Sequence, residues 1–171
     1  MVGLGGWKVR AEATSAIRQD IRGGGGRVVL IAIDIDAEKM WEEVAWLQTL
    51  LGELGVSHLV ITFGFGCNLP IDDLYQPTPL ATKELIRFLK WSSEKGQVNL
   101  GVDNFYFRDV EGAIAFRLDH EQAIAYRGSN DVVTNRIREH WRSRGIRCFA
   151  YPEEFSSDFN LVPPSGWKQP S

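Results

Sequence analysis

The sequence predicts a single α/β domain with a mixed sheet, in which the N-terminal strands are parallel and the C-terminal strands form an antiparallel meander. Before Gly96, continuous apolar runs alternate with apolar residues at helical spacing, as in strand–helix–strand units. After Gly96, apolar and polar residues alternate with a period of two. A chain of 171 residues can be organised by one hydrophobic core. We therefore expect about four helices packed on one sheet within residues 1–160, and a Pro- and Ser-rich tail at 161–171.

The first predicted elements are a helix and a buried strand. Residues 9–21 place apolar side chains on one side of a helix. Four glycines at 23–26 end this helix, because glycine is unfavourable inside a helix but adopts turns freely. Residues 27–33, RVVLIAI, form an apolar run rich in β-branched residues that is too short for a helix, which predicts a buried strand.

A long amphipathic helix and a second strand follow. Apolar residues between positions 37 and 54 recur at spacings of four and three, which predicts a helix. Asp36 is placed to cap its first turn, and Gly55 closes its last. Residues 57–63, SHLVITF, form the second predicted strand, and a loop rich in Gly and Pro follows at 64–77.

The remaining elements are two helices and four strands. Thr78 and Pro79 are typical of an N-cap and a first helical position, so they predict the start of a third helix. The alternating segments after it predict an antiparallel meander with one solvated face. The last predicted elements are strands within 97–107, 113–118 and 123–128, a helix capped by Ser129 or Asn130 and ended by Gly145, and a strand at 146–151.

The composition indicates a soluble protein of the cytoplasm. Charged residues make up 24% of the chain and the formal net charge is −3. No apolar run approaches the ~18 residues that a membrane span needs, and the N-terminus lacks the apolar core of a signal peptide. The two cysteines, Cys67 and Cys148, do not make a disulfide framework.

The acidic residues are unevenly distributed along the chain. Residues 34–73 contain eight acids and one lysine, a local net charge of −7. Trp46 lies beside Glu42 and Glu53 instead of on the apolar stripe, and a tryptophan among carboxylates is typical of a protein interface. We expect a non-enzymatic domain that binds a basic protein, rather than nucleic acid or a membrane. The predicted contact residues are Asp36, Glu42, Glu43, Trp46, Glu53, Asp72 and Asp73.

The final predicted helix carries a row of arginines. A nucleic-acid-binding protein would use such a row against phosphates. The acidic pI of about 5.6 and Glu139 within the row instead favour pairing with the acidic half of the chain, or a solvated face. The arginines are Arg136, Arg138, Arg142 and Arg144, followed by Arg147.

Asp34 and Asp36 allow two interpretations. Two carboxylates that follow a buried strand can bind Mg²⁺ if the backbone turns between them, since this ion prefers oxygen ligands. In the other interpretation Asp36 caps the helix that begins after it, and Asp34 ends the strand in solvent.

The apolar strand ending in Asp-Ile-Asp resembles the first motif of the haloacid-dehalogenase-like phosphatases. The resemblance implies a Mg²⁺-dependent phosphohydrolase or nuclease in which Asp34 is the nucleophile and Asp36 the acid/base. It also implies Thr62 for the second motif. The other residues that it implies are Lys83 or Lys90 for the third motif and Asp103 or Asp109 for the metal site.

The C-terminal stretch from Phe116 to Ile146 resembles small bacterial proteins of the toxin-immunity type. The resembling features are the hairpin Phe116-x-Leu118-x-His120-Glu121, the strand at 124–126 and the helix from Ser129 to Gly145. The resemblance implies an inhibitor whose acidic face meets the basic active site of a toxin. The acidic segment at 34–73 is compatible with this role but lies outside the matched stretch, so no binding residue is carried over.

Overall fold

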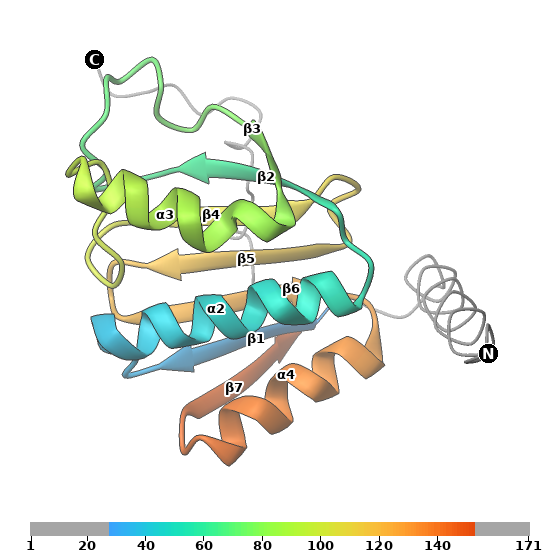
Figure 1. Ribbon diagram of the computed structural model, residues 1–171. Helices are drawn as coiled ribbons and strands as arrows, with labels where there is room; N and C mark the ends of the chain where they lie inside the picture. The colour runs from blue at the N-terminus through green and yellow to red at the C-terminus, as the bar shows by residue number, and fades with distance from the viewer. Residues whose placement is uncertain (1–27, 153–171) are drawn as a thin grey trace, which may run out of the picture.

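The computed structural model describes residues 28–152 (Figure 1), so the helix predicted at 9–21 and the tail predicted at 161–171 lie outside the described residues. The elements are β1 (Val28–Ile33), α2 (Ala37–Glu53), β2 (His58–Phe63), β3 (Thr78–Ala81), the 3-10 turn η1 (Thr82–Glu84), α3 (Leu85–Glu94), β4 (Phe105–Asp109), β5 (Ile114–Asp119), β6 (Ala123–Gly128), α4 (Asp131–Ser143) and β7 (Arg147–Pro152).

The strands form one sheet in the order β3-β2-β4-β5-β6-β1-β7, and every neighbouring pair in it is antiparallel. The predicted α/β domain and the C-terminal meander are therefore confirmed, whereas the predicted parallel pairing of the N-terminal strands is wrong. Four successive antiparallel pairings lead from β1 to β2, so these two strands do run in the same direction. The meander β4-β5-β6 lies between them, and this insertion is what makes the sheet antiparallel throughout.

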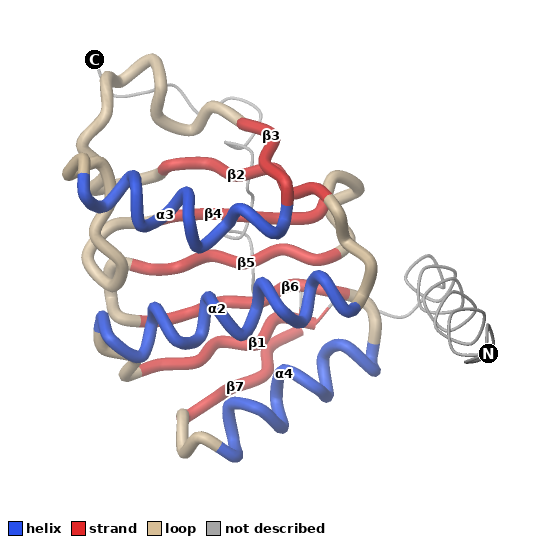
Figure 2. The backbone as a smooth tube through the Cα atoms, in the orientation of Figure 1, coloured by secondary structure: helices blue, strands red, loops and turns tan. Residues whose placement is uncertain are grey.

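The helices α2, α3 and α4 lie on one face of the sheet (Figures 1 and 2). Side chains from this face of the strands pack against the helices and form the main core. The rings of Phe107 and Phe116 stack at 5.0 Å, and Tyr126 follows at 5.3 Å from Phe116. Trp141 from α4 is fully buried in the same core. Within residues 28–152, no helix has the length and apolar character to cross a membrane.

The predicted helix start at Thr78 and Pro79 is wrong, because these residues form the edge strand β3. Pro79 pairs with Val60 of β2, and no strand within residues 28–152 lies on the other side of β3. An edge strand tolerates proline because the missing N–H can face away from the ladder. The chain enters η1 only at Thr82, and α3 follows from Leu85.

The predicted strand within 97–107 is shorter than expected, since only β4 from Phe105 onward belongs to the sheet. Asp103 accepts a hydrogen bond from the Asn99 N–H at 2.7 Å, and the Asp103 N–H donates to the Asn99 carbonyl at 2.9 Å. Gly101 completes this turn with a φ of +81°. Local side-chain bonds of this kind compete with strand pairing, so the alternating pattern extends into a loop.

Candidate functional site

Asp36 is the N-cap of α2. Its carboxylate accepts a hydrogen bond from the Lys39 N–H at 2.9 Å and lies 3.3 Å from the Lys39 ammonium. The backbone N–H of Lys39 lowers the pKa of Asp36 below its ordinary value. The interpretation of Asp36 as a helix cap is therefore confirmed.

The residues implied by the phosphatase resemblance lie apart. Asp34 has a φ of +61° and its carboxylate accepts a hydrogen bond from Arg147 Nε at 2.9 Å. Thr62 is on β2, four strand spacings from β1, which is about 19 Å. Among residues 28–152, no group of three or more His, Cys, Asp or Glu side chains could hold a metal ion. The arrangement thus does not unite Asp34, Asp36 and Thr62.

Glu43 joins α2 to α4. Its side chain is fully buried, and one carboxylate oxygen accepts hydrogen bonds from His140 Nε2 and Trp141 Nε1, each at 3.0 Å. The other oxygen lies 2.9 Å from Arg144 Nε. A buried carboxylate is stable only with partners of this kind, so Glu43 is part of the packing between the two helices.

The other members of the predicted acidic face on α2 are also engaged by α4. The Trp46 ring stacks on the His140 ring at 3.6 Å with an interplanar angle of 3°. Arg136 pairs with Glu53 at 2.6 Å, and Arg144 pairs with Glu42. The predicted pairing of the arginine row with the acidic half is confirmed for these residues. Glu42, Glu43, Trp46 and Glu53 therefore form an internal helix–helix contact, which we call the α2–α4 interface.

His140 in the α2–α4 interface is expected to make the folding stability depend on pH. Burial lowers the pKa of His140, and Arg144 acts in the same direction, while Glu43 opposes the shift. Unfolded chains therefore take up the His140 proton at a higher pH than the folded protein, so stability falls as the pH drops below about 6.5. We expect urea unfolding at pH 7.5 and pH 5.5 to show a smaller loss of stability in His140→Gln than in the wild type. Equal losses in the two proteins would assign the acid sensitivity to other groups.

The loops at one end of the strands are hydrogen-bonded to each other. Strands β1, β2 and β5 finish at this end of the sheet, and β4, β6 and β7 begin there. The Ile35 N–H donates to the Gln122 carbonyl at 2.9 Å, and the Asn104 N–H donates to the Phe65 carbonyl at 2.8 Å. We define the strand-end surface as the exposed acidic and large apolar side chains of these loops and of the first turn of α2, without Asp34, which is paired with Arg147. Its members are Asp36, Glu38, Phe65, Ile71, Asp72, Asp73, Val102 and Glu121.

The strand-end surface combines acids with exposed apolar side chains. Phe65, Ile71 and Val102 are 63%, 56% and 62% exposed, and they are three of the seven large apolar side chains that lie exposed among the described residues. Asp72 and Asp73 make no ion pair with any other described residue. Of the predicted contact residues, the structure thus places Asp36, Asp72 and Asp73 here, away from the α2–α4 interface.

Backbone strain is concentrated in the same loops. Within residues 28–152, the non-glycine residues with positive φ are Asp34, Tyr75 and Gln122, at +61°, +61° and +57°. Such conformations persist only where the surrounding structure holds them, and they cluster at functional sites. Tyr75 is held in this conformation by its N–H, which donates to the Phe63 carbonyl at 2.8 Å.

A hydrogen-bonded network that joins the exposed His120 to the buried Asn104 and Asp119 supports the strand-end surface. Asn104 Oδ1 accepts hydrogen bonds from the His120 N–H at 2.8 Å and lies 2.9 Å from His120 Nδ1. Asp119 is 2.9 Å from the same ring nitrogen and pairs with Arg117 at 2.9 Å. The Cys67 thiol donates to the Asn104 carbonyl, and burial raises its pKa to about 11. A thiol with this pKa is protonated at neutral pH, so Cys67 acts here as a packing residue.

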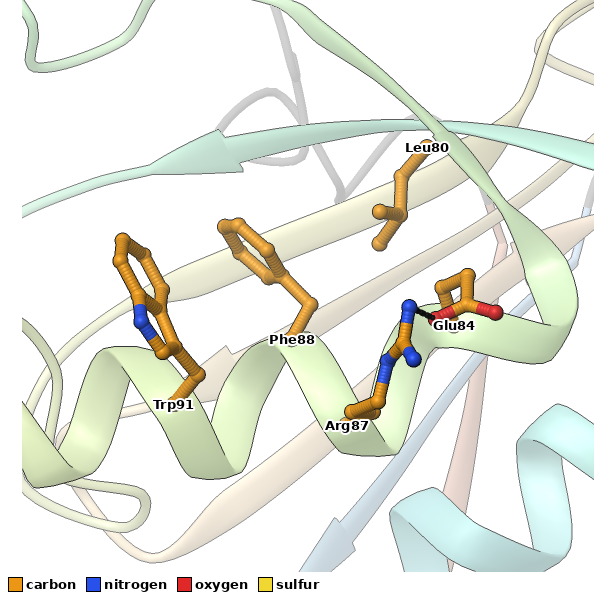
Figure 3. A pocket seen from close by; sticks show the side chains of 5 residues that line it. All are labelled: Leu80, Glu84, Arg87, Phe88 and Trp91. Carbon is orange, nitrogen blue, oxygen red and sulfur yellow. Dashed lines mark ion pairs between the residues drawn. The ribbon is translucent and has the colours of Figure 1, made fainter.

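A separate groove lies between α3 and β3 (Figure 3). Leu80, Phe88 and Trp91 line it, and it measures about 330 Å³. Glu84 and Arg87 form an ion pair at one end. Trp91 is 49% exposed, so it lies off the core side of α3. The exposed side chains nearby on η1 and α3 are mainly basic, so this groove does not extend the acidic surface.

Sequence reasoning missed the apolar members of the strand-end surface. Phe65 stands between Gly64 and Gly66, and an aromatic residue between two glycines in a loop was the available signal. Val102 follows Gly101 in the turn before β4. Both residues read as loop or strand when only periodicity is considered.

Comparison of the chain with protein-family models, with curated protein sequences and with solved structures gave no match. The described residues define the class of the protein by their fold alone, as an α/β domain with one antiparallel seven-stranded sheet.

Proposed function

We propose that this protein is a non-enzymatic, cytoplasmic protein-binding domain of the immunity or inhibitor type, which captures a basic partner with the strand-end surface. The observation that carries the proposal is that Phe65, Ile71 and Val102 lie in the same set of loops as three acids without a counter-ion among the described residues. These acids are Asp72, Asp73 and Glu121. Apolar anchors surrounded by charge are the usual composition of a protein interface.

The charges and the apolar side chains have different roles in this proposal. Asp72, Asp73 and Glu121 attract a basic partner and speed its approach, an effect that salt screens. Phe65 and Val102 supply the apolar area that holds the complex once it has formed. The fixed loops lower the cost of ordering on binding, which favours affinity.

The alternative of a Mg²⁺-dependent enzyme centred on Asp34 and Asp36 receives less support. Asp36 already caps α2, and Asp34 is paired with Arg147. Each carboxylate thus has a role within the fold, and Thr62 lies far along the sheet.

The test is charge reversal at the strand-end surface. Proteins captured from a bacterial lysate are purified and measured one by one against the wild type and a variant with Asp72→Lys, Asp73→Lys and Glu121→Lys. We expect association with the true partner to slow at least ~10-fold at low salt, with a smaller difference at high salt.

The matched control is Glu139→Lys, an exposed acid on α4 with no ion pair to another described residue. It alters the net charge without touching the strand-end surface, so a partner of that surface binds it like the wild type, apart from a small general charge effect. If every purified complex tolerates the triple variant as well as it tolerates the control, the strand-end surface is not the binding site.

A further inference from the structure

A cleft of about 650 Å³ lies at the other end of the strands, away from the strand-end surface. It lies where the last turn of α2, the start of β2 and the junction of β3 with η1 meet. Its volume falls within the range of pockets that hold small molecules. The residues that matter for its chemistry are Gly52, Val56, Ser57, His58, Thr82 and Lys83.

The polar groups of the cleft favour a negatively charged ligand. Lys83 is the one formally charged side chain among the described residues that line it, and it makes no ion pair with another described residue. Ser57 Oγ lies 3.0 Å from His58 Nδ1, which places a hydroxyl and an imidazole side by side. The nearest acids on the adjoining helices are neutralised elsewhere, Glu53 by Arg136 and Glu84 by Arg87.

Thr82 also lines the cleft. The residue is only 4% exposed, and its hydroxyl has no hydrogen-bond partner among the described residues. This oxygen is closed to solvent, so it belongs to the wall behind the cleft and is not counted as a ligand contact.

Gly52 indicates that the cleft is kept open. It lies within α2, it is exposed, and a Cβ added to it would meet nothing within 4 Å. Glycine destabilises a helix relative to alanine, and neither packing nor a positive φ requires it at this position. The missing side chain does keep the wall of the cleft open.

We propose that this cleft binds a small molecule through an oxyanion, a phosphate or a carboxylate group. Lys83 supplies the countercharge, and Ser57 and His58, whose side chains are exposed, supply hydrogen bonds. Val56 and the bare backbone of Gly52 contact the rest of the ligand. The site is separate from the strand-end surface, so it does not depend on the proposed binding of a basic partner.

The experiment is a ¹H–¹⁵N NMR titration of the full chain at constant ionic strength with three probes: inorganic phosphate, citrate and AMP. We expect saturable shifts of the amides at 48–58 and 81–84 with at least one probe. Phosphate and AMP acting without citrate would identify a phosphate group, and citrate acting alone would identify a carboxylate. Lys83→Gln is expected to weaken the binding at least ~10-fold, and Gly52→Gln to block the cleft while the protein stays folded.

Lys90→Gln is the matched control, because it removes a basic residue of α3 that does not line the cleft. It should bind the probes like the wild type. The proposal is overturned if no probe shifts these amides in a saturable way. It is overturned equally if Lys83→Gln and Gly52→Gln bind as well as the control, since the shifts would then report adventitious binding only.

Discussion

Glu43→Ala is expected to lower the free energy of unfolding by about 3 kcal/mol, because it removes the shared acceptor of one fully buried donor and two partly buried ones. Trp141 Nε1 is fully buried and loses its partner at 3.0 Å. His140 Nε2, on a side chain that is 16% exposed, loses the same oxygen. Arg144 is partly exposed and can be rehydrated, which keeps the loss at the lower end of the range for a broken buried ion pair.

Glu42→Ala is the matched control for Glu43→Ala. Glu42 lies next to Glu43 in sequence and also pairs with Arg144, but its side chain is 53% exposed. An exposed ion pair contributes about 0–1 kcal/mol. Urea unfolding of both variants measures the difference directly. Similar small losses in the two variants would mean that Glu43 is not the centre of the α2–α4 interface.

The apolar periodicity of helix α2 predicted the helix itself but not the elements that pack against it. The spacing of its apolar residues predicted both the helix and its buried side, and Asp36 was correctly placed as its N-cap. Periodicity also placed Glu42 and Glu53 away from the apolar stripe. It could not show that a second helix covers part of that side, because α4 lies about ninety residues further along the chain. The acids that looked like a binding face are therefore paired with arginines of α4.

The strands of the sheet could be predicted from the sequence, but their pairing could not. The alternating segment 123–128 was predicted to be a strand, and β6 spans Ala123–Gly128. Strand neighbours are decided by which surfaces bury each other, and this information is not local. A strand–helix–strand order favoured a parallel pair, yet β1 found its partners in β6 and β7.

The strand-end surface could be predicted only in its acidic part. Asp72 and Asp73 stood out as charges in a loop, and the structure leaves them exposed. Phe65 and Val102 are apolar, and an apolar residue in a single sequence is expected to be buried. Their exposure results from the turns that hold them, and Gly66 and Gly101 adopt positive φ beside them.

Phe65→Ala is expected to weaken binding of the partner by about 2 kcal/mol, or roughly 30-fold, while folding stability changes by no more than about 0.5 kcal/mol. The side chain is 63% exposed, so its removal leaves no cavity in the core. Its ring contact is with His120 at a centroid distance of 5.6 Å. Asn104 and Asp119 hold that imidazole independently of Phe65. The pair of measurements is urea unfolding and the dissociation constant of the purified complex.

Phe149→Ala provides the control. Phe149 is 45% exposed on β7, and its substitution removes a comparable ring outside the strand-end surface. A general loss of apolar surface would weaken binding in both variants alike, whereas an anchor at the strand-end surface weakens it in Phe65→Ala alone. If Phe65→Ala instead destabilised the fold by more than about 1.5 kcal/mol, as expected only for residues with a packing role, the ring would be serving the structure. In that case the exposed apolar side chains would no longer distinguish this edge of the sheet, and the case for a protein partner would rest on the acids alone.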